Sequence, residues 1–552
     1  MNIRMTGKRP IRTIKPAAIV AICLIAAGCS MTPNPIPMDE QQALLTQDRL
    51  NAFKDVEPVG PMLTLHEAVA RGLKYNLELR ARRMEQAIAM GAAEISSYDM
   101  LPQITANAGY NYRNNYFVTE AVGYYSGNPS LSEPFVNSSK DYWVGGAMLS
   151  WNLLDFGVSY YTVKQNADRV LVASEKRRRV MHLLAQDIQI AYLRAASAQK
   201  LRDEIERTIQ AASVALSQSE QGSTEGLSNP LDSLRYQKAL LDNIKILETI
   251  EQELATSRVE LNEFVNLPPT AQYMLEDPDR LMPPDSFANT PVQEFEVRAL
   301  AHNADLKEGI YNARIAVEET RKSMLRLLPG LSFNIGPQVS DNQYWINQNW
   351  VEGAAQFSFN LWNILLAPQV RAQALANEEL AVNNRMIVQM AVVSQVYLSK
   401  IDLDNAYKLY QRSKQIETVD TRIAGITARN EREGTASKAQ RVAADASAIL
   451  SRLRKYQALA ALYAASSRLQ ATAGLEPDIG SVDEISLREL SAVVRQTYQQ
   501  WNEGQLPALD FGVADAGAMS AAQPSPELQS EPQPQSKPQR IRISLDDSAV
   551  AQ

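Results

Sequence analysis

Three histidines and two cysteines are the side chains of this sequence best suited to metal binding or nucleophilic chemistry. His66, His182 and His302 lie far apart and do not have the spacing of metal ligands. For His66 and His302, which occupy corresponding places in two similar stretches, a surface or packing role is the better explanation. No glycine-rich phosphate loop, nucleophile elbow or paired-carboxylate motif stands out. The sequence therefore predicts a protein that is not an enzyme, with no catalytic residue, no metal and no cofactor.

The chemistry that the sequence does indicate is acylation of one cysteine. Residues 1–28 join a basic start to the apolar stretch "AAIVAICLIAAG", which is typical of an export signal and too short to span a bilayer. The stretch ends in "AAGC", which resembles the lipobox where a bacterial prolipoprotein is cleaved and its cysteine, here Cys29, is acylated. Because Ser30 stands where an Asp usually retains lipoproteins in the inner membrane, the resemblance implies a lipid-anchored segment at 29–60 and delivery to the outer membrane. An ordinary secretory signal cleaved nearby is the alternative.

Charge and cysteine count exclude two classes of protein. The formal net charge is −7, and removal of the basic signal makes the mature chain still more acidic, so it is a poor candidate for binding nucleic acid. Cys23 is lost with the signal, which leaves Cys29 without a cysteine to pair with in the mature chain. The basic run at 176–179 is interpreted as a solvated helix face.

The sequence repeats itself once at long range. Asn76 and Asn303 stand in the similar stretches "LHEAVARGLKYNLELR" and "FEVRALAHNADLKEG", and Pro102 and Pro329 keep the same separation of 227 positions. A Trp-Asn pair in "SWNLLDFG" returns 211 positions later in "NLWNILLAPQ". The separation falls where the first copy carries the turn-rich stretch 123–140, which has the character of an exposed loop. A duplication of this kind predicts a first repeat at 61–269, a connector at 270–291 and a second repeat at 292–478.

Each copy contains patterns of long helices. Apolar residues at three- and four-residue spacing predict helices before each Pro and after each Trp-Asn pair. Nothing stops a helix between Gly157 and Gly226 or between Pro368 and Gly434, so each would extend about 100 Å at 1.5 Å per residue. The helices expected to pack back on them lie at 230–266 and 436–473.

Between each Pro and the following Trp-Asn pair, polar and apolar residues alternate. The alternation is clear at 104–112, 331–336 and 351–361, whereas "DYWVGGAMLSW" is apolar on both faces. Four strands of about ten residues with one apolar face fit a transmembrane barrel that faces lipid outside and water inside. The tryptophans near the strand ends would form interfacial girdles or simply pack: Trp143, Trp151, Trp345, Trp350 and Trp362.

Four strands cannot enclose a channel, and an open sheet edge in lipid would leave backbone groups unpaired at a cost of several kcal/mol each. Several copies of the chain must therefore share one barrel. The duplicated helix-strand-strand-helix plan, the opening "LTLHEAVARGLKYNLELR", the Leu-Pro pairs before the strands and the turn from Gly226 to Asp232 together resemble the TolC-type outer membrane factors, or outer membrane efflux proteins, in their lipoprotein branch. The resemblance covers about residues 61–478.

This resemblance implies a mainly α fold with a small membrane β-barrel, built from two tandem helix-strand-strand-helix repeats. In that family three protomers pool their strands into a 12-stranded β-barrel, which a long α-helical barrel continues through the periplasm. The homotrimer would be the outer membrane channel of a tripartite efflux or type I secretion system. Its partners would be a periplasmic adaptor, an inner-membrane pump of the RND or ABC type, and outer membrane lipid. A lipid-anchored periplasmic coiled-coil scaffold without a channel is the alternative, although it leaves the matched strands unexplained.

The turns after the two long helices are the candidate functional sites. They would lie about 100 Å from the barrel, where family members meet the adaptor and close the resting tunnel. The residues that match the docking turns are Gly226, Ser228, Leu231, Asp232, Ser233, Gly434, Ser437 and Ala439. A possible gate, whose ion pairs would relax on opening, consists of Arg429, Glu431, Arg432 and Glu433. A solvated helix end is the alternative explanation of these four charges.

Two segments lie beyond the second repeat. Residues 479–515 contain "LRELSAVVRQTYQQW", which predicts a short helix packed around the middle of the tunnel. The Pro-, Gln- and Ser-rich tail at 516–552 cannot build a core and is predicted to be disordered.

Overall fold

The computed structural model describes residues 34–508, apart from 121, 123, 130–132, 225–229, 285–286, 288–289, 481 and 483. The chain divides into two compact units, Met1–Leu506 and Pro507–Gln552, and every element described below belongs to the first. Some sequence predictions fall outside the described residues: those for the signal with Cys29, for Gly226 and Ser228, and for the tail.

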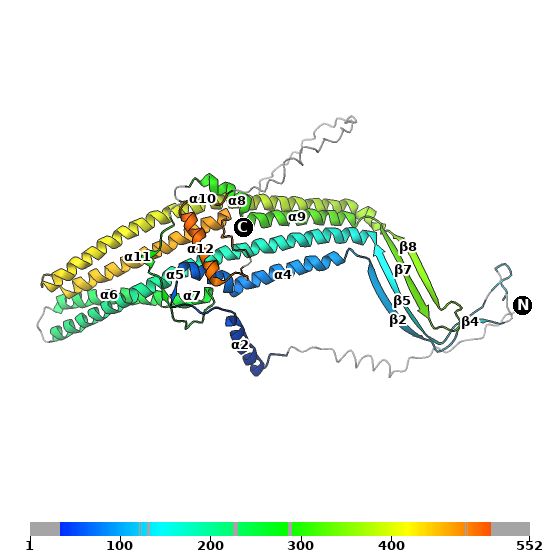
Figure 1. The fold of residues 1–552 in the computed structure, drawn as a ribbon, viewed down its shortest axis with the longest axis horizontal. Coiled ribbons are helices and arrows are strands. Elements are labelled where there is room, and N and C mark those ends of the chain that lie inside the picture. Colours follow the sequence, from blue (N-terminus) through cyan, green and yellow to red (C-terminus); the bar gives the residue numbers. More distant parts are fainter. Residues whose placement is uncertain are drawn as a thin grey trace, which may run out of the picture. The chain divides into compact units, whose positions relative to one another are not determined.

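Two very long helices form the frame of the first unit (Figure 1). α5 (Leu153–Thr224) has 72 residues and α10 (Trp362–Arg432) has 71, so each is about 105 Å long at 1.5 Å per residue. These helices confirm the two uninterrupted stretches predicted from the sequence. α10 begins six residues before the predicted start at Pro368, which lies inside the helix and leaves one main-chain carbonyl without its helical donor.

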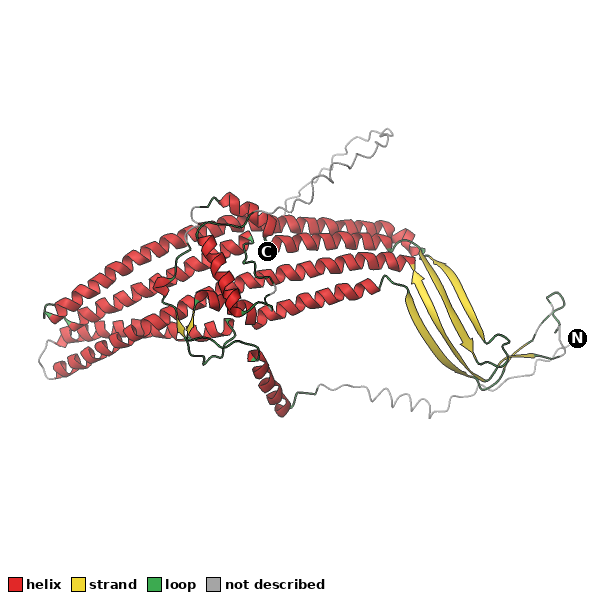
Figure 2. Cartoon of the chain, in the orientation of Figure 1, coloured by secondary structure: helices red, strands yellow, loops and turns green. Residues whose placement is uncertain are grey.

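Shorter helices pack along α5 and α10 and around their middle (Figures 1 and 2). The helix predicted at 230–266 is interrupted at Thr256, whereas the one predicted at 436–473 is continuous. The helices toward the sheet are α4 (Leu77–Tyr98) and α9 (Ala304–Leu325), and those toward the far tip are α6 (Pro230–Ala255) and α11 (Lys438–Ala473). The elements around the middle are α3 (Leu65–Tyr75), α7 (Ser257–Phe264), α8 (Val292–His302), α12 (Leu487–Asn502), the short 3-10 helix η1 (Pro278–Arg280) and the parallel pair β1 (Met62–Leu63) and β6 (Met274–Leu275). A further helix, α2 (Met38–Phe53), precedes them and is exposed along its length.

The duplication is visible in matched helix caps. Asn76 accepts hydrogen bonds from the main-chain N–H groups of the first turn of α4 and donates its own side-chain N–H to the carbonyl of Phe264 (3.1 Å). Asn303 does the same at α9, where its side chain donates to the carbonyl of Thr472 (2.9 Å). Phe264 and Thr472 are themselves 208 positions apart, so the cap and its partner were copied together.

The ends of the packed-back helices also match. α7 is followed by Asn266 at φ 51° and α11 by Gly474 at φ 69°, again 208 positions apart. Both residues adopt the left-handed conformation that commonly ends a helix. At Gly474 a Cβ would lie 2.5 Å from the carbonyl oxygen of His302, so glycine permits the close approach of α11 to the end of α8.

The four predicted strands form one antiparallel sheet of order β2-β5-β7-β8. Their bounds are Gln103–Tyr112, Asp141–Asn152, Gly330–Ser340 and Asn349–Ser358. The first copy's insertion contributes a separate hairpin of β3 (Phe117–Thr119) and β4 (Phe135–Ser138). β2 and β7 each begin directly after a Leu-Pro pair, as predicted, because proline supplies no N–H to the ladder.

Strand register puts the apolar residues on one face. Ile104 lies opposite Leu149, and Leu149 lies opposite Ile335. This register settles β5, whose sequence is apolar on both faces: Trp143 and Leu149 lie on the apolar face, while Met148 lies on the other. The predicted alternation is therefore confirmed for β2, β7 and β8, and the register aligns β5 with them.

Each Trp-Asn pair marks the junction between a strand and a long helix. At the first junction, the side chain of Asn152 caps α5 by accepting hydrogen bonds from the N–H groups of Leu154 and Asp155. At the second junction the N-cap is Leu361, whose side chain makes no capping hydrogen bond. Asn360, one residue earlier, accepts from the N–H of Trp362, while Asn363 of the Trp-Asn pair donates to the carbonyl of Arg326. The junction therefore lies at the same place in both copies, but a different asparagine accepts from the first helical N–H groups.

Ion pairs and hydrogen bonds join the connector between the repeats to both repeats. Lys200 of α5 pairs with Asp277 (2.6 Å). Asp279 accepts hydrogen bonds from Lys455 (2.8 Å) and from the hydroxyl of Tyr456 (3.0 Å), both on α11. Leu275 and Leu281 of the connector also belong to the largest hydrophobic core, which lies around the middle of the long helices.

Candidate functional site

The four-stranded sheet exposes large apolar side chains on one face. Exposed fractions are 76% for Ile104, 53% for Ile335 and 69% for Phe357. β2 and β8 each pair with a neighbour on one side only among the described strands, so the sheet has two open edges. An open-edged sheet with an apolar face requires both an apolar environment and further strands.

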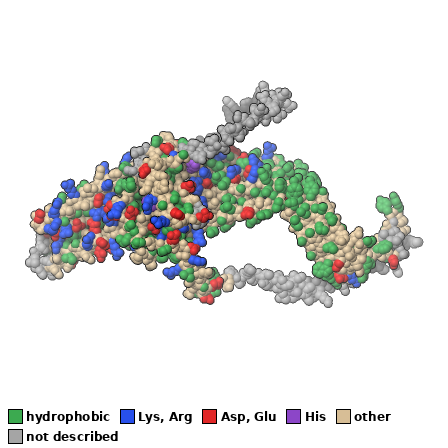
Figure 3. All heavy atoms as spheres, viewed as in Figure 1, with side chains coloured by type: hydrophobic (Ala, Val, Ile, Leu, Met, Phe, Trp, Pro, Cys, Tyr) green, Lys and Arg blue, Asp and Glu red, His purple; other side chains and the backbone are tan. Residues whose placement is uncertain are grey.

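Apolar exposure continues onto the helices next to the sheet (Figure 3). Ile88 and Ile95 on α4 are 70% and 69% exposed, and Ile387 and Met390 on α10 are both 65% exposed. Among the described residues, α10 is the one helix long and apolar enough to cross a bilayer by length and composition alone. Exposed apolar stripes on long helices are typical of surfaces that another chain or lipid covers.

The tryptophans do not all lie where girdles would place them. Trp143 is on the apolar face, 58% exposed, and its ring lies 5.2 Å from that of Tyr110. Trp350, however, lies directly opposite Gln338, and therefore on the polar face of the sheet. The girdle prediction is wrong for Trp350 because the strand phase turns its side chain away from the apolar face.

The turn after α10 has a well-defined geometry. Gly434 has φ 78°, and the next two residues donate their N–H groups to the carbonyl of Asn430. Ser437 then caps α11 in a reciprocal box with Gln440. Ala439 is buried against α5 and α6, with Ala212, Ala215, Leu240 and Val442. Glycine is required here because the chain reverses through the left-handed region.

The described part of the turn after α5 begins at α6. Leu231 is 55% exposed, and Asp232 pairs with Arg235 at 3.6 Å with both side chains in solvent. Ser233 is buried, and its hydroxyl oxygen lies 3.3 Å from that of Ser219 on α5. Of the predicted docking residues on α6, Leu231 and Asp232 are therefore accessible, whereas Ser233 joins α6 to α5.

The four predicted gate residues do not form one cluster. Glu431 pairs with Arg441 of α11 at 3.1 Å, inside the same α10–α11 hairpin. The Arg432 guanidinium donates to the carbonyl of Ala428, and the carbonyl of Arg429 accepts from the N–H of Glu433. The structure thus brings one of the four charges, Glu431, to an ion-pair partner.

Comparison with known proteins identifies the first repeat. Residues 69–266 match the family model described as outer membrane efflux protein. This segment is therefore similar to the outer membrane efflux proteins. A comparison with curated protein sequences found no match.

Over about three quarters of the chain, the fold is similar to that of solved outer membrane channels. The Campylobacter jejuni CmeC outer membrane channel is similar with a TM-score of 0.59 at 11% identity, over 79% of this chain and 89% of that chain. The Vibrio cholerae outer membrane protein VceC gives 0.56 at 12% identity, over 75% and 97%. The open Neisseria gonorrhoeae MtrE outer membrane channel gives 0.54 at 14% identity, over 76% and 91%. These likenesses establish that the chain has the fold of the TolC-type channels.

One arginine that the sequence pattern does not indicate joins three helices. Arg452 of α11 pairs with Glu417 of α10 (3.3 Å) and with Glu204 of α5. Nearer the tip, Lys438 of α11 donates to Gln218 of α5 (2.8 Å). Sequence spacing carries no signal for such contacts, because the partners lie on different helices and far apart in the chain.

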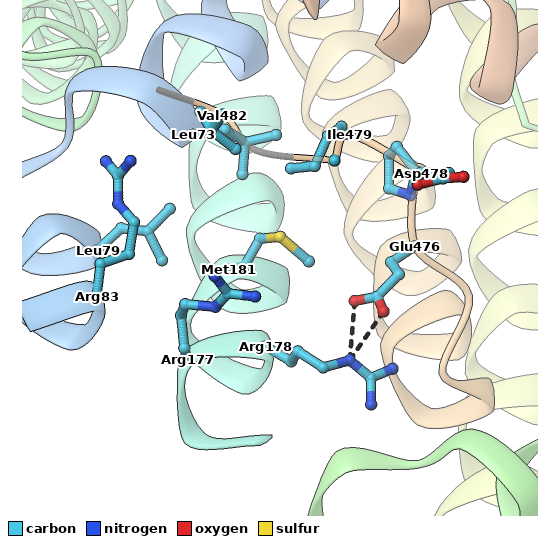
Figure 4. A pocket seen from close by; sticks show the side chains of 12 residues that line it. Leu73, Leu79, Arg83, Arg177, Arg178, Met181, Glu476, Asp478, Ile479 and Val482 are labelled. Atoms are coloured by element: carbon cyan, nitrogen blue, oxygen red, sulfur yellow. Dashed lines mark hydrogen bonds and ion pairs between the residues drawn. The ribbon is translucent and has the colours of Figure 1, made fainter. Parts of the chain in front are cut away.

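The basic run at 176–179 is partly exposed: the side chains of Lys176 and Arg179 are 45% and 44% exposed, whereas that of Arg178 is 12% exposed. Lys176 and Arg179 pair with acids of α9, at 3.7 Å to Glu308 and 2.6 Å to Asp305. Arg178 pairs with Glu476 (2.8 Å) beside a cavity of about 370 Å³ that Leu73, Met181 and Ile479 also line (Figure 4). The run joins the first repeat to the second, and the predicted solvated face holds for Lys176 and Arg179 but not for Arg178.

Among the described residues no group of three or more His, Cys, Asp or Glu side chains is arranged to hold a metal ion. His182 lies instead in the core, where it lines a different, small cavity with Met181 and Ala185, and its Nε2 is 3.8 Å from a carboxylate oxygen of Glu476. Burial lowers the pKa of His182 to about 4, although the Glu476 carboxylate opposes that shift. Burial, together with Arg495, also lowers the pKa of His66 to about 4.

The lowered pKa values of these histidines predict that the folded protein loses stability in acid. The folded chain keeps His182 neutral down to about pH 4, whereas an unfolded chain protonates it near 6.5. Between these values the unfolded state binds more protons, so stability falls as the pH drops, by on the order of 3 kcal/mol for this one residue. Thermal unfolding midpoints measured between pH 7 and pH 4.5 should therefore decline. The decline should be shallower in His182→Gln, and equal slopes in the two proteins would contradict the assignment.

Proposed function

We propose that three copies of this chain form an outer membrane channel, the exit duct of a tripartite efflux or type I secretion system. The observation that carries the proposal is the open-edged, four-stranded sheet with one exposed apolar face. A third of a 12-stranded barrel has this form, and pairing β8 of one copy with β2 of the next removes every edge. The polar face would then line the water-filled interior.

The helices support the same assembly. The exposed apolar stripes lie on α4 and α10, the helices that continue directly from the sheet, and neighbouring protomers would cover them. α5 and α10 would extend the channel about 100 Å into the periplasm. At the far tip, the accessible Leu231 and Asp232 would contact a periplasmic adaptor, which links the channel to an inner-membrane pump of the RND or ABC type.

Lipid anchoring at Cys29 belongs to the same proposal. Two acyl chains on one protein are enough to hold it stably in a membrane, and they need no contact with the folded core. Cys29→Ala is therefore expected to reduce outer membrane delivery more than it reduces folding.

Two measurements test the proposal. Native mass spectrometry of the protein purified in mild detergent should show three copies, each carrying lipid mass on Cys29, and planar bilayers should show ion conductance. The lipid-anchored scaffold without a channel predicts no conductance. It also predicts that trypsin added to whole cells leaves the loop at 113–140 intact, whereas an outer membrane barrel exposes that loop. A lipid-free monomer without conductance would end the proposal.

We further propose that Glu431 helps to hold the periplasmic tip closed through Arg441. Glu431→Lys and Arg441→Glu should each lower tip stability by about 0.5–1 kcal/mol and increase conductance and antibiotic leakage, because each places like charges together. The double exchange should restore both properties. Glu433→Lys, at the exposed helix end, is the matched control and should change neither. If Glu433→Lys leaks as much as Glu431→Lys, the Glu431–Arg441 ion pair does not hold the tip closed.

A further inference from the structure

An aromatic cluster lies at the end of the sheet farthest from the helices. The ring of Trp345, in the β7–β8 turn, lies 5.6 Å from the ring of Trp350 and 6.1 Å from that of Tyr142. Trp350 is at the start of β8 and Tyr142 at the start of β5, and both strands run from this end toward the helices. We call these three residues the mouth triad.

Strand register places Trp350 and Tyr142 on the polar face of the sheet, and Trp345 contacts both of their rings from the turn. Gly146, Gln338 and Trp350 lie in one row across β5, β7 and β8, so their side-chain directions share a face. Tyr142 stands opposite Asn111 and is four residues from Gly146, which puts it on that face as well. The triad therefore does not face lipid in the proposed channel but lies at its external mouth.

The turn that carries Trp345 is held in place by a buried asparagine. Asn342 is fully buried, and its side chain accepts from the N–H and hydroxyl of Ser139 and donates to the hydroxyl of Ser138. The N–H of Trp345 donates in turn to the carbonyl of Asn342 (3.0 Å). Asn342, with its hydrogen bonds made, joins the two external turns and so fixes the positions of the rings. A ligand would therefore lose little free energy to ordering them when it binds.

An acidic side chain accompanies the rings. Glu352 is two residues after Trp350 on β8 and lies opposite Gly336, so it projects from the same face, about 7 Å farther into the channel. Glu352 is exposed, and among the described residues it has no ion-pair partner. The basic side chains at this end of the sheet lie over other rings. The charged groups of Lys140 and Arg113 are each 4.8 Å from a ring centroid, that of Tyr116 and that of Phe117 respectively.

We propose that the mouth triad and Glu352 form a binding site for organic cations at the exit of the channel. Aromatic faces attract ammonium groups, with tryptophan the strongest, and a carboxylate beside them adds charge complementarity. The site rests on the proposed channel function for its place in export, and it would favour amphipathic cations over neutral or anionic solutes leaving the channel.

Block of ion current tests the site directly. Tetrabutylammonium, added to the external side of the full-length protein in planar bilayers, should block the current. Trp350→Leu and Glu352→Gln should each raise the half-blocking concentration about two- to fivefold, the usual size of one exposed cation–π contact. Trp143→Leu is the matched control, since Trp143 is close by on the opposite, apolar face. Equal block in wild type and in both site variants, or an equal shift in Trp143→Leu, would overturn the site.

A second measurement separates this proposal from the channel function. In detergent-solubilised full-length protein, choline should change the tryptophan fluorescence, and its neutral isostere 3,3-dimethyl-1-butanol should not. The response should disappear in Trp350→Leu and remain in Trp143→Leu. A fluorescence response to choline in a protein that conducts no current would reject the channel function and keep the binding site. Current without either block or a choline response would reject the site and keep the channel.

Discussion

Replacing Ile335 with arginine should remove most of the assembled protein from the outer membrane. Ile335 is the middle residue of β7, lies opposite Leu149 and Gly353, and is 53% exposed on the apolar face. In the proposed barrel this position faces lipid near the midplane, where an arginine costs about 2–4 kcal/mol. A trimer carries the substitution three times, so assembly should fall well over tenfold.

The adjacent residue provides the control. Asn334 has the same depth but lies opposite Ser150 and Ala354 on the polar face. Asn334→Arg should assemble almost normally and alter conductance, because its charge enters water. The amount of heat-modifiable oligomer in outer membrane fractions measures both variants. Equal loss from both would mean that the sheet does not separate lipid from water.

Much of this fold follows from periodicity and from the duplication. The long helix after the first Trp-Asn pair was predictable because no Pro and only one Gly, at position 222, lies within 158–225, and the strands because their period of two differs from that of a helix. The duplication then placed Asn76 and Asn303 at equivalent caps, since one local sequence produces the same cap twice. Such features depend on neighbours in the chain, which a sequence displays directly.

Features that depend on distant partners were not predictable in the same way. The face of Trp350 follows from its pairing with Gln338, and the partner of Glu431 is on the next helix. The break at Thr256 has no Gly or Pro to announce it. The site at the channel mouth was hidden for the same reason: Tyr142 and Trp345 are about 200 residues apart in sequence, and only the sheet brings them together.

Gly336→Ala is expected to have a comparable effect inside the sheet. Gly336 is buried in β7, and a Cβ there would lie 1.9 Å from the carbonyl oxygen of Ala147 and 2.9 Å from the Cα of Met148. Both obstacles are main-chain atoms of β5, so no side-chain rotation relieves the clash. Pro337 already interrupts the ladder next to this position, because it has no N–H to donate. The strands must therefore separate, at a cost of about 3 kcal/mol or more.

A matched glycine in the same sheet distinguishes this clash from the general effect of adding a methyl group. Gly109 in β2 also lies on the polar face, but a Cβ there would be 3.4 Å from a methyl of Val144, an ordinary contact. Gly109→Ala should leave the thermal unfolding midpoint unchanged or slightly raised, since alanine restricts the unfolded chain more than glycine does. Gly336→Ala should lower both the midpoint and the yield of oligomer. If the two variants have the same thermal unfolding midpoint, β5 and β7 are not in contact at Gly336. The register that places Trp350 on the channel face then loses its support.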